Sequence, residues 1–311
     1  MSSTTPPAEA RKPWWQPGPF DYSSAELFIM RAAFAVLLFV SIKWETGPYK
    51  TQRNPTGLAN FFDLTWLAEH PPGAAWQAIT LCGLILYVVG RLPALGLAPA
   101  LSFAVLIGTL ITSKAMHHSW QLVTLIALAQ WVIYLWPREG WGLGSLLRPS
   151  LAVQRLATYA STVVFAASYV VCGLVKLVNS DFKWIAKVPY LSVQLLKSNW
   201  SAYYDAVPQA VVPGRLMPPD SPPWLDQTVQ AIVDYPNIAR VFFGMGLLIE
   251  LTAFVVLINR RWAFCGGLVI IGMHLSISKV MDLHFEYHIL AALIFVVNLP
   301  GALLAWRKRE G

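Results

Sequence analysis

Residues 155–178 read RLATYASTVVFAASYVVCGLVKLV, and this stretch decides the class of fold. Between Arg155 and Lys176 it contains no charged residue, and apolar or small side chains predominate. At about 1.5 Å per helical residue, the rise from Arg155 to Lys176 is roughly 30 Å, which equals the thickness of the hydrocarbon core of a bilayer. The stretch is therefore predicted to be a helix that crosses a membrane.

The composition of the whole chain agrees with this class. Of its 311 residues 56% are hydrophobic and 13% are charged, whereas soluble domains contain about 25% charged residues. The formal net charge of +7 comes from short basic clusters between apolar runs, a pattern that indicates topology signals and anionic lipid headgroups and no nucleic-acid partner. The three cysteines have neither CxxC nor metal-ligand spacing, so no disulfide framework and no metal site are expected.

Further apolar segments of similar length predict an all-α membrane protein, a polytopic bundle of about eight transmembrane helices. The predicted spans are residues 26–44, 75–91, 93–113, 119–136, 155–178, 240–259, 262–281 and 283–305. In this organisation residues 1–25 form a polar cytoplasmic segment, residues 26–306 the transmembrane domain and residues 307–311 a basic cytoplasmic tail. Two segments of the domain, residues 45–74 and 179–237, are expected on the outer side.

Lysine and arginine in the short loops set the expected orientation. With a cytoplasmic N-terminus, that side contains Arg11, Lys12, Arg91, Arg138, Arg148, Arg155, Arg260, Arg261, Arg307, Lys308 and Arg309. The short connections of the other side contain only Lys50, Arg53, Lys114 and Lys279. We therefore expect both termini on the cytoplasmic side.

Ionisable groups in or beside spanning segments are costly, which makes them candidate functional residues. The helical rise places Lys176 at the outer face, where the loop after the third span and the connection before the last span are also expected. Three separate parts of the chain thus converge on one face and predict a site there. The ionisable residues concerned are Lys176, Lys114, His117, His118, Lys279, Asp282, His284, Glu286 and His288.

Glu250 and His274 lie deeper, within the predicted spans 240–259 and 262–281. Because a very short loop joins these spans, they must be antiparallel neighbours, and the two residues have similar depth. We expect them to be coupled more closely to each other than to any other ionisable group. A structural interhelical hydrogen bond and an acid–base role both remain open.

These residues also have structural explanations. Lys176 can extend from its helix end to the headgroups, and the tandem histidines of the third loop can cap a helix or lie in a hydrated loop. A helix places His284 and His288 on one face and Glu286 elsewhere, so a three-ligand metal site is not predicted.

A family resemblance rests on these same residues. The element Tyr169-Val-Val-Cys-Gly173-Leu-Val-Lys176-Leu177, followed by Trp184, resembles the horizontally transferred transmembrane (HTTM) domain, which is shared with vitamin K-dependent gamma-carboxylases. Met116-His117-His118-Ser119-Trp120 is similar to the Trp-Asn-Asn-His-Ser element of the carboxylase. The acidic residue, basic loop, histidine helix and Phe-rich last span of the family resemble Glu250, Arg260-Arg261, His274 and Phe285. The similarity covers roughly residues 25–305.

The resemblance implies a bacterial inner-membrane protein with an outward-facing pocket for a lipophilic, vitamin K-like quinol. Lys176 is then the base that deprotonates the quinol, and His118 assists it. Other residues are expected to bind the ligand or support the site, and they are His117, Glu250, His274, Lys279, His284, Glu286 and Trp184.

The resemblance leaves the reaction open. The carboxylase has two adjacent lysines where this chain has Val175-Lys176, and it continues into a large lumenal region that recognises the substrate protein. Carboxylation of a protein is therefore not expected, although carboxylase-like or oxidoreductase chemistry on a quinol is. The alternative is a non-enzymatic membrane subunit that assists assembly or maturation of a membrane or periplasmic partner, with residues 179–236 as its contact surface.

Overall fold

The computed structural model describes most of the chain. The described residues are 21–42, 44–52, 55–112, 120–136, 146–188, 218–219, 221–281 and 283–310. In these ranges the regular secondary structure is helical and includes no strand, which confirms the all-α fold class.

Five helical segments are long and apolar enough to cross a membrane. They are α1 (Ser24–Ser41), α4 (Pro93–Thr112), α7 (Leu151–Asn179), α11 (Pro236–Leu251) with its 3₁₀ continuation η4 (Ala253–Leu257), and α12 (Arg260–Met281). Three apolar segments are shorter, namely α3 (Ala74–Val89), α5 (Gln121–Leu135) and the pair formed by α13 (Glu286–Ala291) and the π-helical η5 (Ala292–Val296). The first seven predicted segments thus coincide with helices, but a bundle of eight spans is not confirmed.

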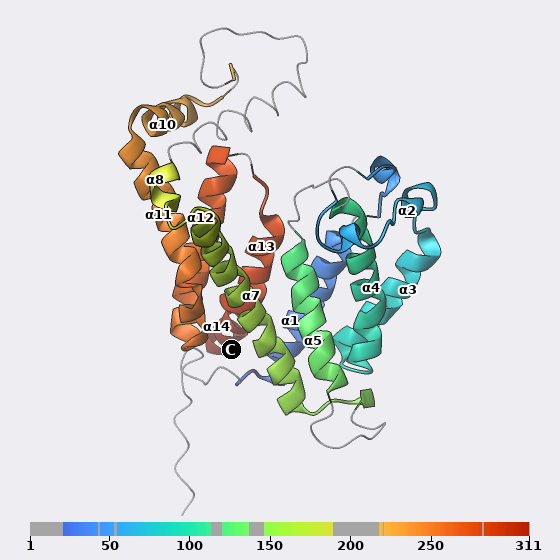
Figure 1. Cartoon of the computed structure of the whole chain (residues 1–311). Coiled ribbons are helices and arrows are strands. Elements are labelled where there is room, and N and C mark those ends of the chain that lie inside the picture. The colour runs from blue at the N-terminus through green and yellow to red at the C-terminus, as the bar shows by residue number, and fades with distance from the viewer. Residues whose placement is uncertain are drawn as a thin grey trace, which may run out of the picture.

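The predicted final span, residues 283–305, is not one continuous helix. After η5 the chain reaches Asn298, whose φ is +52°, and then begins α14 (Leu299–Glu310). A residue in the left-handed region ends a right-handed helix, so the chain turns there. α14 packs against α1 and lies at the end of the bundle where α1 begins (Figure 1).

The π-helical turn η5 has a partner on α7. Thr162 Oγ1 donates a hydrogen bond of 3.0 Å to the carbonyl oxygen of Phe295. A π-helical turn departs from the regular hydrogen-bond ladder, and in an apolar environment a displaced carbonyl group needs a partner from a neighbouring helix. Thr162 therefore stabilises the irregular turn.

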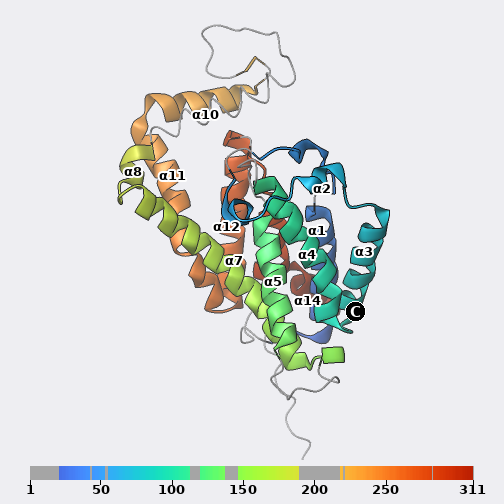
Figure 2. The same ribbon diagram turned by 45° about the vertical axis from the view of Figure 1, so that its right-hand side comes forward.

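The helices form two groups (Figures 1 and 2). One contains α1, α3, α4 and α5, and the other contains α7, α11, α12 and α13, while α7 packs on both α5 and α11. The described chain begins and ends at the same end of the bundle, which we call the terminal end. The opposite, distal end contains the short elements η1 (Gly47–Tyr49), η2 (Gly57–Asn60), α2 (Trp66–Glu69), α8 (Trp184–Lys187) and α10 (Pro223–Asp234), and α10 runs across the end of α11 (Figure 2).

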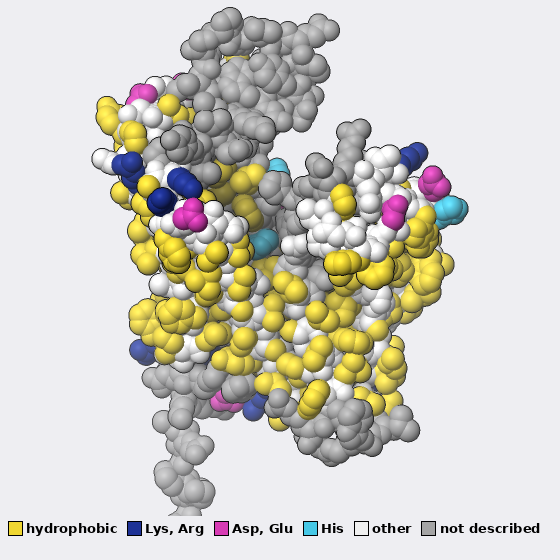
Figure 3. Space-filling model, viewed as in Figure 1, with side chains coloured by type: hydrophobic (Ala, Val, Ile, Leu, Met, Phe, Trp, Pro, Cys, Tyr) yellow, Lys and Arg dark blue, Asp and Glu magenta, His cyan; other side chains and the backbone are white. Residues whose placement is uncertain are grey.

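Side chains of different types occupy different levels of the surface. Hydrophobic side chains cover the middle of the face in Figure 3, and charged side chains gather near the distal and terminal ends. Water does not favour so wide an apolar band, whereas lipid does. The surface is therefore typical of a membrane protein.

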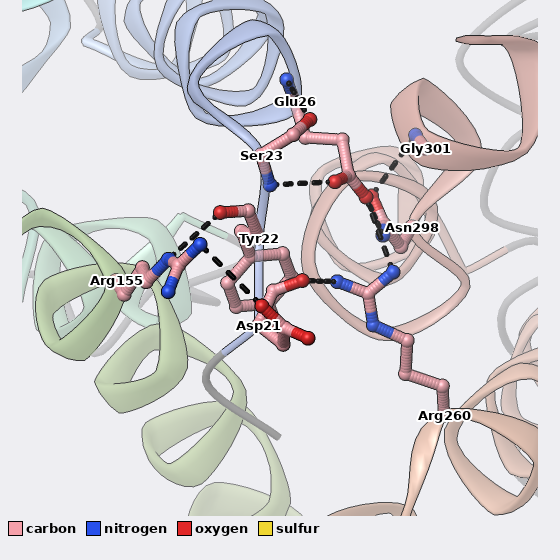
Figure 4. Close-up of polar contacts among 8 residues, drawn as sticks. All are labelled: Asp21, Tyr22, Ser23, Glu26, Arg155, Arg260, Asn298 and Gly301. Carbon is pink, nitrogen blue, oxygen red and sulfur yellow. Dashed lines mark hydrogen bonds and ion pairs between the residues drawn. The ribbon is translucent and has the colours of Figure 1, made fainter. Parts of the chain in front are cut away.

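A buried ion pair joins the helices at the terminal end (Figure 4). Arg260 Nη1 lies 3.2 Å from Glu26 Oε1, and both side chains are about one-tenth exposed or less. Asn298 Nδ2 donates to the same carboxylate oxygen at 3.0 Å, and Arg260 Nη2 donates to the carbonyl oxygen of Asp21 at 2.7 Å. Arg260, predicted only as an orientation signal, thus connects α1, α12 and the start of α14.

The aromatic ring of Tyr22 completes this cluster. The guanidinium of Arg260 lies 4.9 Å from the ring centre, and Arg155 on α7 donates to the Tyr22 carbonyl oxygen at 2.8 Å. Burial raises the pKa of the Tyr22 hydroxyl, although Arg260 opposes this shift. Tyr22 therefore faces the cation as a neutral phenol.

A second set of buried polar contacts joins helices of the first group to each other and to α7. Arg31 of α1 is buried, and it donates to the Val88 carbonyl oxygen at 3.2 Å and to Gln154 Oε1 at 2.5 Å. Tyr87 donates to Gln130 Oε1 at 2.6 Å. Side chains from α1, α3, α5 and α7 therefore hold one another by hydrogen bonds within the apolar bundle.

Candidate ligand-binding site

One face of α7 supplies the first residues of the candidate site. Tyr169, Gly173 and Lys176 follow the i, i+4, i+7 spacing that places side chains on a single helix face. A Cβ atom on Gly173 would lie 3.3 Å from Glu250 Cβ and 2.9 Å from Leu251 Cδ2. The absence of a side chain at Gly173 thus lets α11 approach α7 closely, which brings Glu250 beside Lys176.

Lys176 and Glu250 form an ion pair. Lys176 Nζ donates to Glu250 Oε1 at 2.5 Å, and the two side chains are 35% and 12% exposed. The other carboxylate oxygen, Oε2 of Glu250, is buried and has no hydrogen-bond partner among the described residues. The pair therefore retains an unused acceptor.

A tight turn after α7 places Trp184 over this pair. Asp181 and Phe182 have φ values of +53° and +58°, and Phe182 N–H donates to the Leu177 carbonyl oxygen at 2.8 Å. These are features of a Schellman cap, which usually contains glycine. The reversal lets α8 return toward α7, so that the Trp184 ring centre lies 5.6 Å from Lys176 Nζ.

The ion pair and Trp184 line a cavity of about 460 Å³. Helix α11 contributes most of its walls, and α12 contributes the remainder of the apolar lining. α11 is also the least buried of the five long helices, with 17% of its apolar window buried, so one side of it faces the surroundings of the bundle. Besides Lys176, Trp184 and Glu250, the lining residues are Ile238, Val241, Phe242, Phe243, Met245, Gly246, Leu247, Ile249, Met273, Ser276 and Ile277.

A histidine cluster lies near the ion pair. The hydroxyl of Tyr169 is hydrogen-bonded to Nε2 of His274, and the ring centre of His288 lies 5.4 Å from that of His274. Nδ1 of both histidines is buried and has no partner in the described part of the chain. Tyr169 lies on the same face of α7 as Lys176, and it therefore connects this face to the buried His274 of α12.

The expected direct pair between Glu250 and His274 is wrong. Glu250 bonds to Lys176 and His274 bonds to Tyr169, so each takes its partner from α7. Similar depth on antiparallel neighbours made contact possible, but α11 packs along α7, and the side chains of α7 are the nearer partners.

The remaining predicted site residues lie elsewhere. His284 and Glu286 lie in an exposed contact of 3.1 Å between Nδ1 and Oε1, and Lys279 is exposed in the last turn of α12. None of the three lines the cavity. Another group of predicted residues, Lys114, His117, His118 and Asp282, lies outside the described residues. Within the described residues, no group of three or more His, Cys, Asp or Glu side chains is placed to hold a metal ion.

Residues of the cavity lining and of the histidine cluster contain buried polar atoms without partners. Within the described ranges they include Glu250 Oε2, Trp184 Nε1, His274 Nδ1 and His288 Nδ1. Buried polar groups are almost always hydrogen-bonded, and an apolar cavity with a few convergent polar groups is the usual form of a ligand site. The cavity can accommodate an apolar molecule whose polar group contacts the Lys176–Glu250 pair.

Three residues with important polar contacts in the structure were not among the predicted site residues. Glu26 and Arg31 lie inside the first predicted span, and the rule that ionisable groups in spans have partners would have singled them out. Tyr169 belongs to the sequence element that contains Lys176, and its position two helical turns before Lys176 places it on the same helix face, but apolar pattern and spacing do not indicate its contact with His274.

The sequence matches no family model, no curated protein and no solved structure. Similarity therefore assigns neither a family nor a function to this chain.

Proposed function

We propose that this chain is a membrane protein whose cavity between α7, α8, α11 and α12 binds a lipophilic ligand of the quinol type. The cavity itself is the observation that carries the proposal. Its walls are mainly apolar, and three of its polar residues, Lys176, Glu250 and Trp184, come together. This combination of an apolar enclosure with a few convergent polar groups is the usual form of a small-molecule site.

The ion pair modifies the base role predicted for Lys176. An ammonium group that donates to Glu250 has no free lone pair, so Lys176 cannot accept a proton until it has lost one. We assign the first acceptor role to the carboxylate of Glu250, a residue of the cavity lining. The ligand hydroxyl transfers its proton to this carboxylate, and the neighbouring Lys176 ammonium stabilises the resulting oxyanion.

The resemblance to the HTTM domain supports the same ligand class, since it singles out Lys176 and Trp184 in the sequence. In this proposal the distal end faces the outside of a bacterial inner membrane, and the terminal end with its arginines faces the cytoplasm. His118 lies outside the described residues, and its role as helper remains a prediction from the resemblance.

Quinone binding to purified protein tests the proposal. Wild-type protein in nanodiscs should bind decylubiquinol, and Lys176→Met should weaken binding about tenfold or more because a charge-assisted hydrogen bond is lost. Lys187→Met is the matched control, since Lys187 is an exposed lysine of α8 outside the cavity lining. Absence of binding by the wild type, or equal binding by both variants and the wild type, would refute the proposal.

A second candidate function is that of a membrane subunit that contacts a partner through the distal end. The supporting observation is α10, where Trp224 is 50% exposed and the adjoining Tyr235 is 62% exposed. Large aromatic side chains are enriched at protein interfaces, although they also anchor proteins at the membrane surface. Purification in mild detergent distinguishes the two functions, because the subunit requires a stoichiometric partner that is lost on Trp224→Ser and Tyr235→Ser substitution.

A further inference from the structure

Three exposed basic side chains lie around the distal end of α11, namely Lys183, Lys187 and Arg240. The two lysines are one helical turn apart at α8, where Lys187 N–H donates to the Lys183 carbonyl oxygen at 3.0 Å. Arg240 lies in the second turn of α11. Figure 3 shows Lys and Arg side chains gathered at the distal end in the region of α8 and α11. We call these three residues the cationic rim.

Packing of α8 on α11 holds the rim together. A Cβ atom on Gly244 of α11 would lie 3.2 Å from Ile185 Cδ1 of α8, so the two helices touch there, one helical turn after Arg240. Val188 and Ala239 belong to one buried cluster, and they directly adjoin Lys187 and Arg240 in the sequence. The three cations therefore lie at one level of the bundle.

The positive charge of the rim is not neutralised by ion pairs with described residues. None of its three cations forms an ion pair with a carboxylate of the described ranges, and Arg240 Nη1 donates to the neutral Asn237 Oδ1 at 2.8 Å. The nearby carboxylates in the sequence are Asp181 and Asp234, and Asp234 accepts from Gln230 at 2.7 Å. The rim therefore has an excess of positive charge.

The rim lies where a spanning helix leaves the bilayer. The segment Pro236–Leu257 is long and apolar enough to cross a membrane, and Arg240 is near its distal end. Exposed aromatic side chains, those of Trp224 and Tyr235, lie just before this segment, and Trp and Tyr are enriched at the level of the lipid headgroups. The rim is therefore expected at that level as well.

An exposed apolar face continues from the rim along α11. Val241, Met245 and Leu248 are 67%, 52% and 52% exposed, and their spacing of four and three residues places them on one helix face. A phospholipid has the matching arrangement, with a phosphate above apolar chains. Basic residues beside the ends of spanning helices commonly bind the headgroups of anionic lipids.

We propose that the cationic rim binds anionic phospholipids of the leaflet at the distal end, with their phosphates at the rim and their acyl chains along the exposed face of α11. A topology signal does not explain the lysines, because they belong to the long segment 179–237, to which the bias of short loops does not apply. Binding at the rim is independent of the quinol-type ligand, since none of the three cations lines the cavity.

Photo-crosslinking of the full chain in nanodiscs tests this site. Phosphatidylglycerol or phosphatidylcholine with a diazirine in one acyl chain is added at equal mole fraction, and adducts on residues 238–248 are quantified by mass spectrometry. Each basic residue near a membrane surface raises the affinity for an anionic lipid about fivefold, so phosphatidylglycerol should give about tenfold more adduct or more. Equal labelling by the two lipids would overturn the proposal.

Two triple variants connect the preference to the rim. Lys183→Gln/Lys187→Gln/Arg240→Gln should lower labelling by phosphatidylglycerol to the level of phosphatidylcholine. The matched control Lys50→Gln/Arg91→Gln/Arg148→Gln removes the same charge from exposed residues elsewhere and should retain the preference. Equal labelling of the two variants by phosphatidylglycerol would overturn the assignment to the rim.

A soluble head group distinguishes a lipid site from a site for free phosphate esters. An excess of sn-glycero-3-phosphoglycerol has the phosphate but no acyl chains, and it should leave the labelling of the wild type by phosphatidylglycerol unchanged. A fall to the level of phosphatidylcholine would show that the anion alone is recognised, and the lipid assignment would then be wrong. The quinone-binding test of the cavity is not affected by either result.

Discussion

Removal of the buried arginine at the terminal end should destabilise the fold strongly. In Arg260→Met, Glu26 loses its charged partner at 3.2 Å, while its side chain stays about one-tenth exposed. Breaking a buried ion pair on one side costs about 3–5 kcal/mol. Asn298 and the backbone N–H of Ser23 still donate to the carboxylate, at 3.0 Å and 2.7 Å, so we expect the lower part of this range, about 3 kcal/mol.

The double variant Glu26→Leu/Arg260→Met isolates the origin of this loss. Replacement of a buried ion pair by apolar side chains is often neutral, so the double variant should be more stable than Arg260→Met alone. The free energy of unfolding is measured in micelles by steric trapping, with Arg91→Met, an exposed arginine at the terminal end, as control. A loss below about 1 kcal/mol for Arg260→Met, the range of an exposed pair, would refute the reasoning, as would a double variant less stable than the single one.

Two further predictions concern helix contacts and orientation. Gly96→Ala should destabilise the protein by about 1–3 kcal/mol, because a Cβ atom there would lie 2.5 Å from the Gly83 carbonyl oxygen. Gly272→Ala, where a Cβ atom meets nothing within 4 Å, should instead stabilise the helix by up to about 1 kcal/mol, and equal thermal stability of the two variants in detergent would contradict the packing argument. Reporter fusions after Arg148 and Arg261 should report the cytoplasm and a fusion at residue 206 the outer compartment, whereas the reverse pattern would place the cavity on the wrong side of the proposed topology.

The sequence predicts the helices of this protein well because apolar length is a local property. Residues 155–178 lie inside α7, and residues 262–281 lie inside α12. The prediction of one continuous span followed apolar length alone, although Asn298 with Pro300 two residues later is typical of a helix end. The left-handed turn is further stabilised by contacts with α1. Glu26 Oε1 accepts from Asn298 Nδ2, and Asn298 Oδ1 accepts from Gly301 N–H, contacts that no periodic pattern reveals.

In the candidate site, too, the sequence pattern did not reveal which side chains contact each other. Helical rise placed Lys176 at one level of the bundle and Glu250 and His274 at another, but rise along an axis does not tell which way a side chain faces. The glycine at position 173 lets α11 approach α7, and this contact determines the partner of Glu250. Depth was therefore predictable, whereas pairing depended on the packing of three helices.

Two ion-paired carboxylates, Glu26 on α1 and Glu250 on α11, have different surroundings, and only Glu250 lies in a candidate site. Glu26 has described donors for both oxygens, since Arg260 and Asn298 donate to Oε1 and the Ser23 N–H donates to Oε2. The cavity beside Arg260 measures about 20 Å³, which is room for about one water molecule. Glu250 has one such donor, an unused oxygen and a cavity of about 460 Å³. The Glu26–Arg260 pair, whose carboxylate has donors for both oxygens, therefore stabilises the junction of three helices. The Lys176–Glu250 pair, whose carboxylate has a donor for one oxygen, retains the hydrogen-bonding capacity that a ligand requires.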